Sequence, residues 1–419
     1  MIGISRLSIN NPILRKLEVV VTVIWLLYFL DIKIPPSLSL LFNALSYPII
    51  AILVAVHWKR IAYVATRNIP LLIFVGTAMF SFFWSTNLSM TFDGSRGLLR
   101  TFLFGAYFVT SYNLQEQMKI LVKVFALIAI LTVLVYLAFP SYGDAIGGWA
   151  GIFPYKNYLG RAMVLGAILF FITALNNLKS SWLTWILFGL AIFLTLLSDS
   201  STSLLLLLIM LPQMLFYWII QQKYKLRSIL LSFVCILIFG VIVFIVANQE
   251  TILVDILGEG LTFNGRTPIW TLVIEKVFHE KPILGYGYQA FWSSDAGSYV
   301  IMHTWASNEA PSIPTTFNAH NAYLEIFANL GFLGLFLYGL VLLDIFPKII
   351  ILLFSTKKIL FFWLLQFLIF IFFASLADVG IGLGNTSTYG MLSISAFLSI
   401  SLEYERFFKH KKINAFTTS

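Results

Sequence analysis

Charge is scarce in this chain of 419 residues. Asp, Glu, Lys and Arg make up 11% of it, whereas an ordinary soluble domain carries about 25%. Hydrophobic residues make up 59%, and the mean hydropathy is +0.91. A surface that faces water on all sides needs more charged residues than this. The composition therefore excludes a water-soluble enzyme. Aromatic residues at 16%, with 40 Phe, fit helices that cross a membrane.

Cysteine and the familiar catalytic motifs are also scarce. The single cysteine, Cys235, cannot form an intrachain disulfide, and no cysteine pair is present to hold zinc. The sequence has no Gly-rich phosphate loop, no Gly-x-Ser-x-Gly elbow and no His-Glu-x-x-His. It also has no Asp-x-Asp pair of the kind that holds Mg²⁺ or Mn²⁺ with a sugar diphosphate. These absences favour a site that works without a metal.

Twelve apolar runs predict membrane-spanning helices, because a span needs about 20 mostly apolar residues. The expected fold is therefore an all-α polytopic membrane protein with about 12 transmembrane helices. The first run follows a basic tail and lacks a small-residue cleavage site, which favours a retained span over a signal peptide. The predicted spans are 17–31, 38–56, 69–84, 96–112, 120–139, 158–175, 182–197, 202–220, 229–247, 322–346, 359–376 and 388–403.

The spans divide the chain into three parts. Residues 1–247 hold spans one to nine, residues 248–321 form one long extracytoplasmic loop, and residues 322–419 hold spans ten to twelve and a basic cytoplasmic tail. The loop is too long for a mere connector. Thr267 is expected to cap a helix inside it, with Pro268 at the first helical position. Its expected apolar face is Ile269, Leu272, Val273 and Val277.

The distribution of Lys and Arg predicts the orientation, because cytoplasmic loops are enriched in these residues. With the N-terminus in the cytoplasm, most of the 27 bases fall on the cytoplasmic side and both termini lie inside. The net charge of +9 then reflects topology and argues against a nucleic-acid partner. The bases expected outside are Lys33, Arg96, Arg100, Lys156, Arg161, Arg266, Lys276 and Lys281.

Several of these outer bases lie near predicted span ends. Arg96 and Arg100 are four residues apart and share one helix face. Arg161 lies in the first turn of a span, and Arg266 follows an Asn-Gly turn in the long loop. A cation near the bilayer is costly unless it faces a polar cavity or an anion. The bases therefore either reach the outer headgroups or line an outward pocket for an anionic headgroup such as a diphosphate, whose oxygens suit arginine.

One histidine and a few acids complete the candidate chemistry. His320 lies where the long loop enters a span, and a histidine there can act as a general base near neutral pH. The intramembrane acids Glu18, Glu325, Asp344 and Asp378 lie near span ends. A proton-coupled transporter more typically buries acids at the midplane.

Three segments carry a resemblance to a known family. They are Gly-Ile-Phe-Pro-Tyr-Lys-Asn-Tyr-Leu-Gly-Arg at 151–161, Phe-Asn-Gly-Arg-Thr-Pro-Ile-Trp at 263–270 and Ala-His-Asn-Ala-Tyr-Leu-Glu at 319–325. Pro-Ile-Leu-Gly-Tyr-Gly at 282–287 and Asn-Leu-Gly-Phe-Leu-Gly at 329–334 follow the last two. In this order, around a large outer loop, the segments resemble the O-antigen ligase and O-antigen polymerase superfamily, and within it the exopolysaccharide polymerases.

The resemblance implies a membrane-embedded glycosyltransferase of the class C kind. Such enzymes transfer a glycan from an undecaprenyl-diphosphate carrier at the outer face of the bacterial plasma membrane, without a metal and with inversion. The resemblance implies that Arg161 and Arg266 bind the donor diphosphate and that His320 lies at the reaction centre. The further substrate-binding candidates are Arg96 and Arg100, assigned mainly from placement, and Lys156, Asn321 and Tyr155.

One departure from the family pattern concerns the first of these segments. Many polymerase-like members have His-Lys-Asn where this chain has Tyr155-Lys156-Asn157. The departure argues against a catalytic role for Tyr155, whose phenol can still form a hydrogen bond. The Gly-Tyr-Gly-Tyr run at 285–288 has two interpretations, a sugar-stacking surface or, more in keeping with its surroundings, packing within the loop.

The expected partners follow from the same resemblance. They are an undecaprenyl-diphosphate-linked glycan, an acceptor glycan or lipid A-core, membrane lipid, a flippase and a chain-length regulator, with no cofactor and no nucleic acid. A repeat-unit polymerase is the favoured function, and a ligase that moves the finished glycan to lipid A-core or protein is the alternative. A lipid-linked glycan transporter also fits twelve spans, although transporters more often show two similar halves joined by an inside connector.

Overall fold

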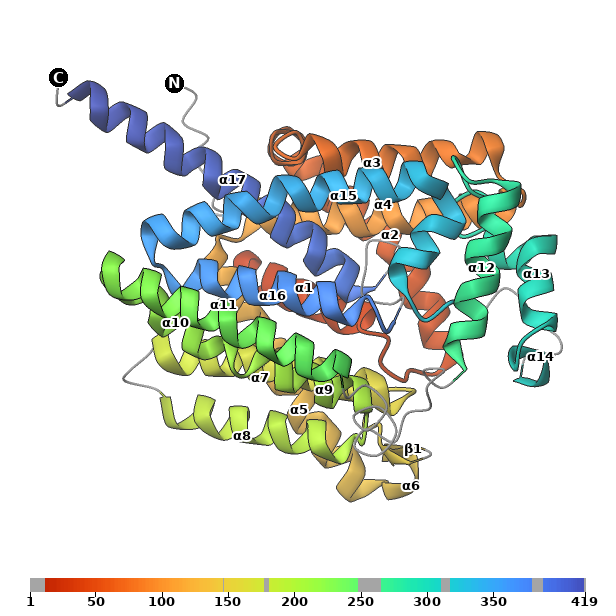
Figure 1. The fold of residues 1–419 in the computed structure, drawn as a ribbon, viewed down its shortest axis with the longest axis horizontal. Coiled ribbons are helices and arrows are strands. Elements are labelled where there is room, and N and C mark those ends of the chain that lie inside the picture. Colours follow the sequence, from red (N-terminus) through yellow and green to blue (C-terminus); the bar gives the residue numbers. More distant parts are fainter. Residues whose placement is uncertain are drawn as a thin grey trace.

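The computed structural model describes residues 12–145, 147–176, 181–247, 265–309, 317–378 and 387–417, and this part of the chain is almost entirely helical (Figure 1). Two strands of two residues each form a small antiparallel hairpin. The elements are α1 (Pro12–Phe29), α2 (Pro36–Ala65), α3 (Ile69–Phe80), η1 (Ser81–Trp84), α4 (Leu88–Ser111), α5 (Leu114–Ala138), α6 (Pro140–Gly143), β1 (Asp144–Ala145), β2 (Gly148–Trp149), α7 (Lys156–Asn176), α8 (Ser181–Leu197), α9 (Ser201–Met210), α10 (Gln213–Gln221), α11 (Tyr224–Ala247), α12 (Arg266–Glu280), η3 (Phe291–Ser293), α13 (Asp295–Met302), α14 (Ala306–Glu309), α15 (Ala322–Thr356), α16 (Ile359–Ala374) and α17 (Thr388–Thr417).

The predicted spans coincide with helices of this fold. The run at 202–220 is divided into α9 and α10 at Pro212, which has no backbone N–H to continue the helix. The helices that are long and apolar enough to cross a membrane are Pro36–Ala65, Leu114–Ala138, Lys156–Asn176, Ser201–Gln221 and Ala322–Thr356. These features confirm an all-α membrane protein, whereas the number of twelve spans stays a prediction.

The helices form a bundle with two distinct ends (Figure 1). We call the end where α1 begins and α17 finishes the termini end. The opposite end, where α12, α13 and α14 lie, is the loop end. The described part of the long loop that forms α12, α13 and α14 thus lies at the end opposite both termini. Residues 248–264 and 310–316 of that loop lie outside the described residues, and the side of the membrane that each end faces stays a prediction.

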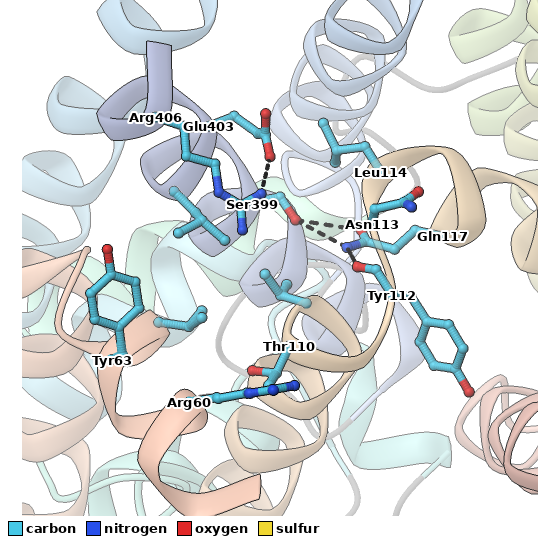
Figure 2. Close-up of a pocket in the computed structure, with 13 residues that line it drawn as sticks. Arg60, Tyr63, Thr110, Tyr112, Asn113, Leu114, Gln117, Ser399, Glu403 and Arg406 are labelled. Carbon is cyan, nitrogen blue, oxygen red and sulfur yellow. Dashed lines mark hydrogen bonds and ion pairs between the residues drawn. The ribbon is translucent and has the colours of Figure 1, made fainter. Parts of the chain in front are cut away.

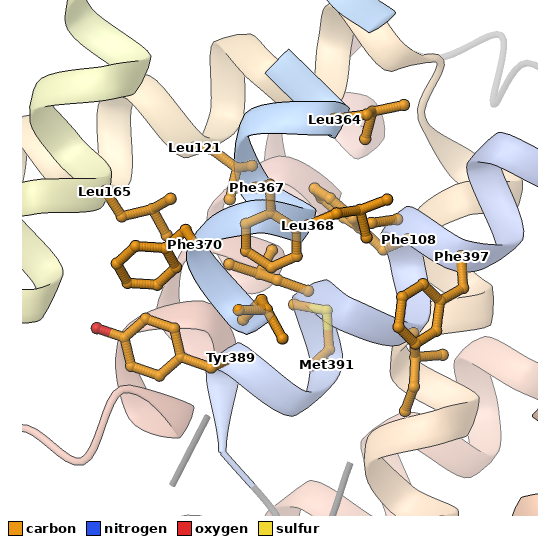
Figure 3. Packing of buried hydrophobic residues seen from close by; sticks show 14 of the residues in the cluster. Phe108, Leu121, Leu165, Leu364, Phe367, Leu368, Phe370, Tyr389, Met391 and Phe397 are labelled. Carbon is orange, nitrogen blue, oxygen red and sulfur yellow. The ribbon is translucent and has the colours of Figure 1, made fainter. Parts of the chain in front are cut away.

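Helix α7 is surrounded by other helices, which its almost wholly apolar surface allows. Every residue from Leu159 to Phe170 is buried. Figure 3 shows the surrounding apolar cluster, to which α4 contributes Phe108, α5 contributes Leu121 and α16 contributes Phe367. Arg161 belongs to this buried stretch and is 3% exposed. The fold therefore brings one guanidinium into its interior, where it needs a polar partner.

The helix predicted inside the long loop is α12, and its buried face is Ile269, Val273 and Val277. Its predicted cap, Thr267, was wrong. The N-cap is Gly265, which has φ 77°. The Trp305 indole donates to the Gly265 carbonyl oxygen at 2.8 Å and packs where a Cβ atom would lie. This distant contact starts the helix two residues early and makes Arg266 its first residue.

Helix α15 is interrupted at Gly331, whose φ of 63° and ψ of −158° are not helical. The segment after α12 docks into the interruption. Phe332 N donates to Pro282 O at 2.8 Å, and Tyr286 N donates to Ala328 O at 3.1 Å. A Cβ atom on Gly331 would lie 2.4 Å from the backbone of Ile283, so only glycine fits.

This docking also decides between the two interpretations of the 285–288 run. Tyr286 and Tyr288 are each 2% exposed. Their rings pack inside the protein and are not available to stack on a sugar. The run therefore connects α12 to α15 and holds these two helices in a fixed position relative to each other. Arg266 is the first residue of α12, and His320 lies just before α15.

Candidate active site

His320 lies in the short loop that leads into α15. The Asn318 side-chain oxygen accepts from His320 N at 2.9 Å, and the histidine takes a left-handed conformation with φ 49°. A residue other than glycine adopts this conformation at a cost, so its surroundings must hold it there. Asn321 caps α15, because its side-chain oxygen accepts from Tyr323 N at 3.0 Å and from Leu324 N at 3.2 Å.

A buried carboxylate holds the other side of this loop. Glu325 is 5% exposed. Its Oε1 accepts from Ala319 N at 2.7 Å and from the Trp292 indole N–H at 2.7 Å, and its Oε2 accepts from Asn329 Nδ2 at 3.4 Å. Such hydrogen bonds are what make a buried carboxylate tolerable. They tie the residue that precedes His320 to α15 and to η3.

Arg161 and Arg266 reach the same short stretch of chain after α16. The Arg161 guanidinium donates to Asp378 Oδ2, and it lies 4.9 Å from the ring centroid of Tyr158. Arg266 Nη1 donates to the carbonyl oxygen of Ala377 at 3.3 Å. Two arginines from α7 and α12, far apart in the sequence, thus meet at the loop end of the bundle.

The electrostatics show that His320 belongs to this group. Burial, followed by the positive charges of Arg266 and Arg161, lowers the pKa of His320 to about 4. The imidazole is therefore neutral at physiological pH and can accept a proton. The structure brings together all three residues that were predicted to be catalytic, while their roles stay predictions.

Arg96 and Arg100 lie on α4 and face α2. Arg100 Nη1 donates to Asn43 Oδ1 at 2.5 Å and to Ser46 Oγ at 2.9 Å. Arg96 is exposed and donates to Asp93 at 2.9 Å, one turn earlier in its own helix. Both guanidinium groups also lie over the Tyr47 ring, at 5.1 Å for Arg96 and 4.9 Å for Arg100. Their contacts hold them against α2, so a role in substrate binding stays a prediction.

Tyr155 and Lys156 lie at the start of α7, on the rim of the loop end. Tyr155 is 64% exposed, and its ring meets the ring of Tyr158 edge-on at 5.7 Å. Lys156 Nζ donates to Gly147 O at 3.0 Å and lies 3.8 Å from Asp199 Oδ2. These two candidates are more accessible than Arg161, five residues further along the helix.

The sequence did not predict the role of Asp378 as the partner of Arg161. It lies 217 residues from Arg161, and its place near a span end was the only signal. The described residues hold no group of three or more His, Cys, Asp or Glu side chains that could bind a metal ion. Independence from metals stays a prediction.

A polar cavity lies away from these residues, at the termini end, and has a volume of about 100 Å³ (Figure 2). Arg60, Gln117, Ser399, Glu403 and Arg406 line it together with apolar residues. Arg406 donates to Glu403 at 2.6 Å, and Gln117 donates to Ser399 at 3.4 Å. Four of the five polar side chains thus pair with one another, which favours a structural role for the cavity.

The fold and the site define a polytopic, all-α membrane protein with an arginine-rich polar site at one end of its bundle. Residues 186–339 match the O-antigen ligase family. This match supports the O-antigen ligase and polymerase superfamily and confirms the resemblance seen in the sequence. Arg266 and His320 lie inside the matched range, and Arg161 lies before it. No curated protein matches the chain.

Proposed function

We propose that the chain is a glycosyltransferase that joins undecaprenyl-diphosphate-linked oligosaccharide repeat units at the outer face of the bacterial plasma membrane, without a metal. The observation that carries the proposal is the meeting of Arg161, Arg266 and a neutral His320 at the loop end. The match to the O-antigen ligase family supports glycan transfer as the chemistry. The same proposal puts the loop end outside the cell and both termini in the cytoplasm.

The two arginines bind the donor diphosphate in this proposal. Their planar guanidinium groups pair with phosphate oxygens and stabilise the negative charge that grows as the diphosphate leaves. The Asp378 carboxylate holds the Arg161 guanidinium while no donor is bound. The donor diphosphate then takes its place, since it carries more negative charge than one carboxylate.

His320 acts as the general base. The acceptor hydroxyl oxygen attacks the anomeric carbon from the side opposite the diphosphate, and its proton passes to the neutral imidazole. The bond between the anomeric carbon and the diphosphate oxygen breaks, and undecaprenyl diphosphate leaves with the electron pair. The configuration at the anomeric carbon is inverted. The imidazolium ion then returns its proton to water.

Donor binding prepares His320 for this step. The charges of Arg266 and Arg161 contribute to the low pKa of the free imidazole. The negative diphosphate offsets those charges, so the pKa of His320 rises when the donor is bound. The histidine is neutral before the donor arrives and becomes a stronger base in its presence.

The acceptor distinguishes the two enzyme alternatives. The run at 151–161 favours a polymerase, whose acceptor is a second lipid-linked repeat unit. The family match favours a ligase, whose acceptor is lipid A-core or a protein. Both use the same diphosphate site and the same base, so the site alone fits either reaction.

The test is a transfer assay with purified protein in nanodiscs, EDTA and lipid-linked repeat units extracted from cells that lack this chain. A ladder of longer lipid-linked glycans supports a polymerase, and a product formed only after addition of lipid A-core supports a ligase. Either activity should be lost in His320→Ala and Arg266→Ala. Full activity in His320→Ala would remove the assigned base. Movement of the lipid-linked glycan across vesicles without any new glycosidic bond would instead support a transporter.

A further inference from the structure

Tyr389 carries a buried hydroxyl group that the proposed mechanism does not use. The residue is 8% exposed, and within the part of the chain that the structure describes its hydroxyl has no hydrogen-bond partner. Figure 3 shows the ring at the edge of the apolar cluster, with the hydroxyl directed away from it. A buried hydroxyl without a partner costs stability, so a ligand or water is expected to satisfy it.

Arg161 and Tyr158 lie beside this hydroxyl. The charge of Arg161 acts on both tyrosines, and the Tyr158 ring lies 4.9 Å from the Arg161 guanidinium. The Nε atom of Arg161 is also buried without a hydrogen-bond partner in the described structure. Two buried polar groups without a hydrogen-bond partner in the described structure, the Tyr389 hydroxyl and Arg161 Nε, therefore lie between α7 and α17.

Asp31 supplies a carboxylate to the same group. Hydrogen bonds hold the chain on both sides of Asp31 against the elements that carry the tyrosines: Thr388 Oγ donates to Leu26 O at 2.9 Å, and Lys33 N donates to Ile152 O at 2.7 Å. The residue follows α1 in a left-handed conformation with φ 56°, and its side chain is exposed. It lines a hollow of about 550 Å³ together with Lys33, Tyr142 and other residues of the loop end. This volume falls in the range of roughly 300–1,000 Å³ that is typical of small-molecule sites.

The chemistry of these residues differs from that of the diphosphate site. A carboxylate would repel a second phosphate group, but it readily accepts hydrogen bonds from hydroxyl groups. Tyrosine hydroxyls can donate and accept, and aromatic rings offer an apolar face. The combination of one acid, two tyrosines and an open hollow suits a hydroxyl-rich saccharide.

We propose that Asp31, Tyr158 and Tyr389 form a saccharide subsite that binds the sugar attached to the donor diphosphate. The inference rests on the proposed function, because Arg161 is the residue that connects the two subsites. The diphosphate lies between Arg161 and Arg266, and the sugar extends from it past Tyr158 and Tyr389 towards Asp31. The neighbouring hollow then holds the rest of the repeat unit.

The test measures the affinity of protein in nanodiscs for two probes. One probe is the lipid-linked saccharide extracted from cells that lack this chain, and the other is undecaprenyl diphosphate without sugar. Asp31→Asn and Tyr389→Phe should each weaken binding of the first probe about tenfold and change binding of the second less than about twofold. Arg266→Ala should weaken both.

Tyr107→Phe is the matched control. Tyr107 is a fully buried tyrosine of the bundle, and its hydroxyl donates to Glu18 at 2.7 Å. Its variant should leave the affinity for both probes unchanged, whereas Tyr389→Phe should affect only the sugar-bearing probe. A thermal unfolding measurement on each variant separates lost binding from lost folding.

The outcomes distinguish this inference from the proposed function. If Asp31→Asn and Tyr389→Phe weaken both probes equally, or neither, the saccharide subsite is overturned while the diphosphate site stands. If Arg266→Ala leaves both affinities unchanged, the proposed function itself fails. Selective loss of the sugar-bearing probe in both variants supports the subsite.

Discussion

The two ends of the bundle hold their arginines and lysines in different ways. At the termini end, several bases form ion pairs with nearby carboxylates. Examples are Arg67 with Glu405 at 3.0 Å, Lys348 with Asp344 at 2.6 Å and Arg406 with Glu403 at 2.6 Å. At the loop end, Arg161 and Arg266 lie against Ala377 and Asp378, a segment with one carboxylate. Arg100 is held by an amide and a hydroxyl.

The difference shows that basic residues can either stabilise the packing of helices or provide a positive site for an anion. A base paired with its own acid contributes little net charge, and it joins neighbouring helices or turns. Two guanidinium groups that share a segment with one carboxylate keep an excess of positive charge, which attracts an anion. The local balance of charge around Arg161 and Arg266 therefore indicates where an anionic substrate binds better than the number of bases at each end does.

Removing a loop-end arginine should have the largest effect. Arg266→Ala should lower the rate of glycan transfer by at least about 100-fold, because it removes a group that stabilises the leaving diphosphate. Arg406→Ala at the termini end should change the rate less than about twofold, since exposed ion pairs contribute little. Initial rates with saturating donor measure both. Equal losses of transfer rate in the two variants would show that the loop-end and termini-end arginines do not differ in their role in transfer.

The pH dependence of transfer should report the charges around His320. The pKa of the free imidazole is about 4. Protonated histidine cannot accept a proton, so kcat/KM should fall about tenfold per pH unit as the pH drops below that value. Because bound diphosphate raises the pKa, the acid limb of kcat should lie at a higher pH.

Arg266→Gln sharpens this measurement, because it removes one of the charges that lower the pKa. The acid limb of kcat/KM should move towards the ordinary histidine value of about 6.5. If the acid limb of the wild-type kcat/KM profile already lies near pH 6.5 and does not move in Arg266→Gln, the arginine charges do not lower the pKa of His320.

Glu325 is expected to position His320 through Ala319. Glu325→Gln keeps the shape of the side chain but loses one acceptor oxygen, so kcat should fall about tenfold with little change in KM. The loss of unfolding free energy should be about 1–3 kcal/mol. Asp344→Asn is the control at the termini end, and it should leave kcat unchanged. If Glu325→Gln lowered stability without changing kcat or its pH profile, Glu325 would be merely structural.

Arg96 should give the smallest effect, although it lies at the loop end. It is exposed and paired with Asp93 within its own helix. Arg96→Ala should therefore change both transfer and stability only slightly, by less than about twofold and about 0.5 kcal/mol. A loss as large as that of Arg266→Ala would extend the diphosphate site to α4.

The sequence predicted the features that depend on local pattern. Apolar runs predicted the helices, and the apolar face of Ile269, Leu272, Val273 and Val277 predicted α12, in which all of these but the half-buried Leu272 are buried. Its first residue was missed because Trp305, 40 residues away, decides it. The interruption of α15 was missed for the same reason, since Gly331 needs Pro282 and Ile283 to dock against it.

The candidate site depends more on distant contacts. The family resemblance pointed to Arg161, Arg266 and His320, but it did not show what holds them. Asp378 has no local signature that marks it as the partner of Arg161. The start of α17, which carries Tyr389, is likewise held by a distant element, because Thr388 donates to the carbonyl oxygen of Leu26 in α1 at 2.9 Å. Only the packed helices reveal these partners.

The most direct test of the account is the binding of undecaprenyl diphosphate to the protein in nanodiscs with EDTA present. The wild-type protein should bind it, and Arg161→Gln and Arg266→Gln should each weaken the affinity at least about tenfold. Arg67→Gln, at the termini end, should bind as the wild type does. Equal affinity in all four proteins, or binding that appears only after a divalent metal is added, would contradict an anion site built from the loop-end arginines.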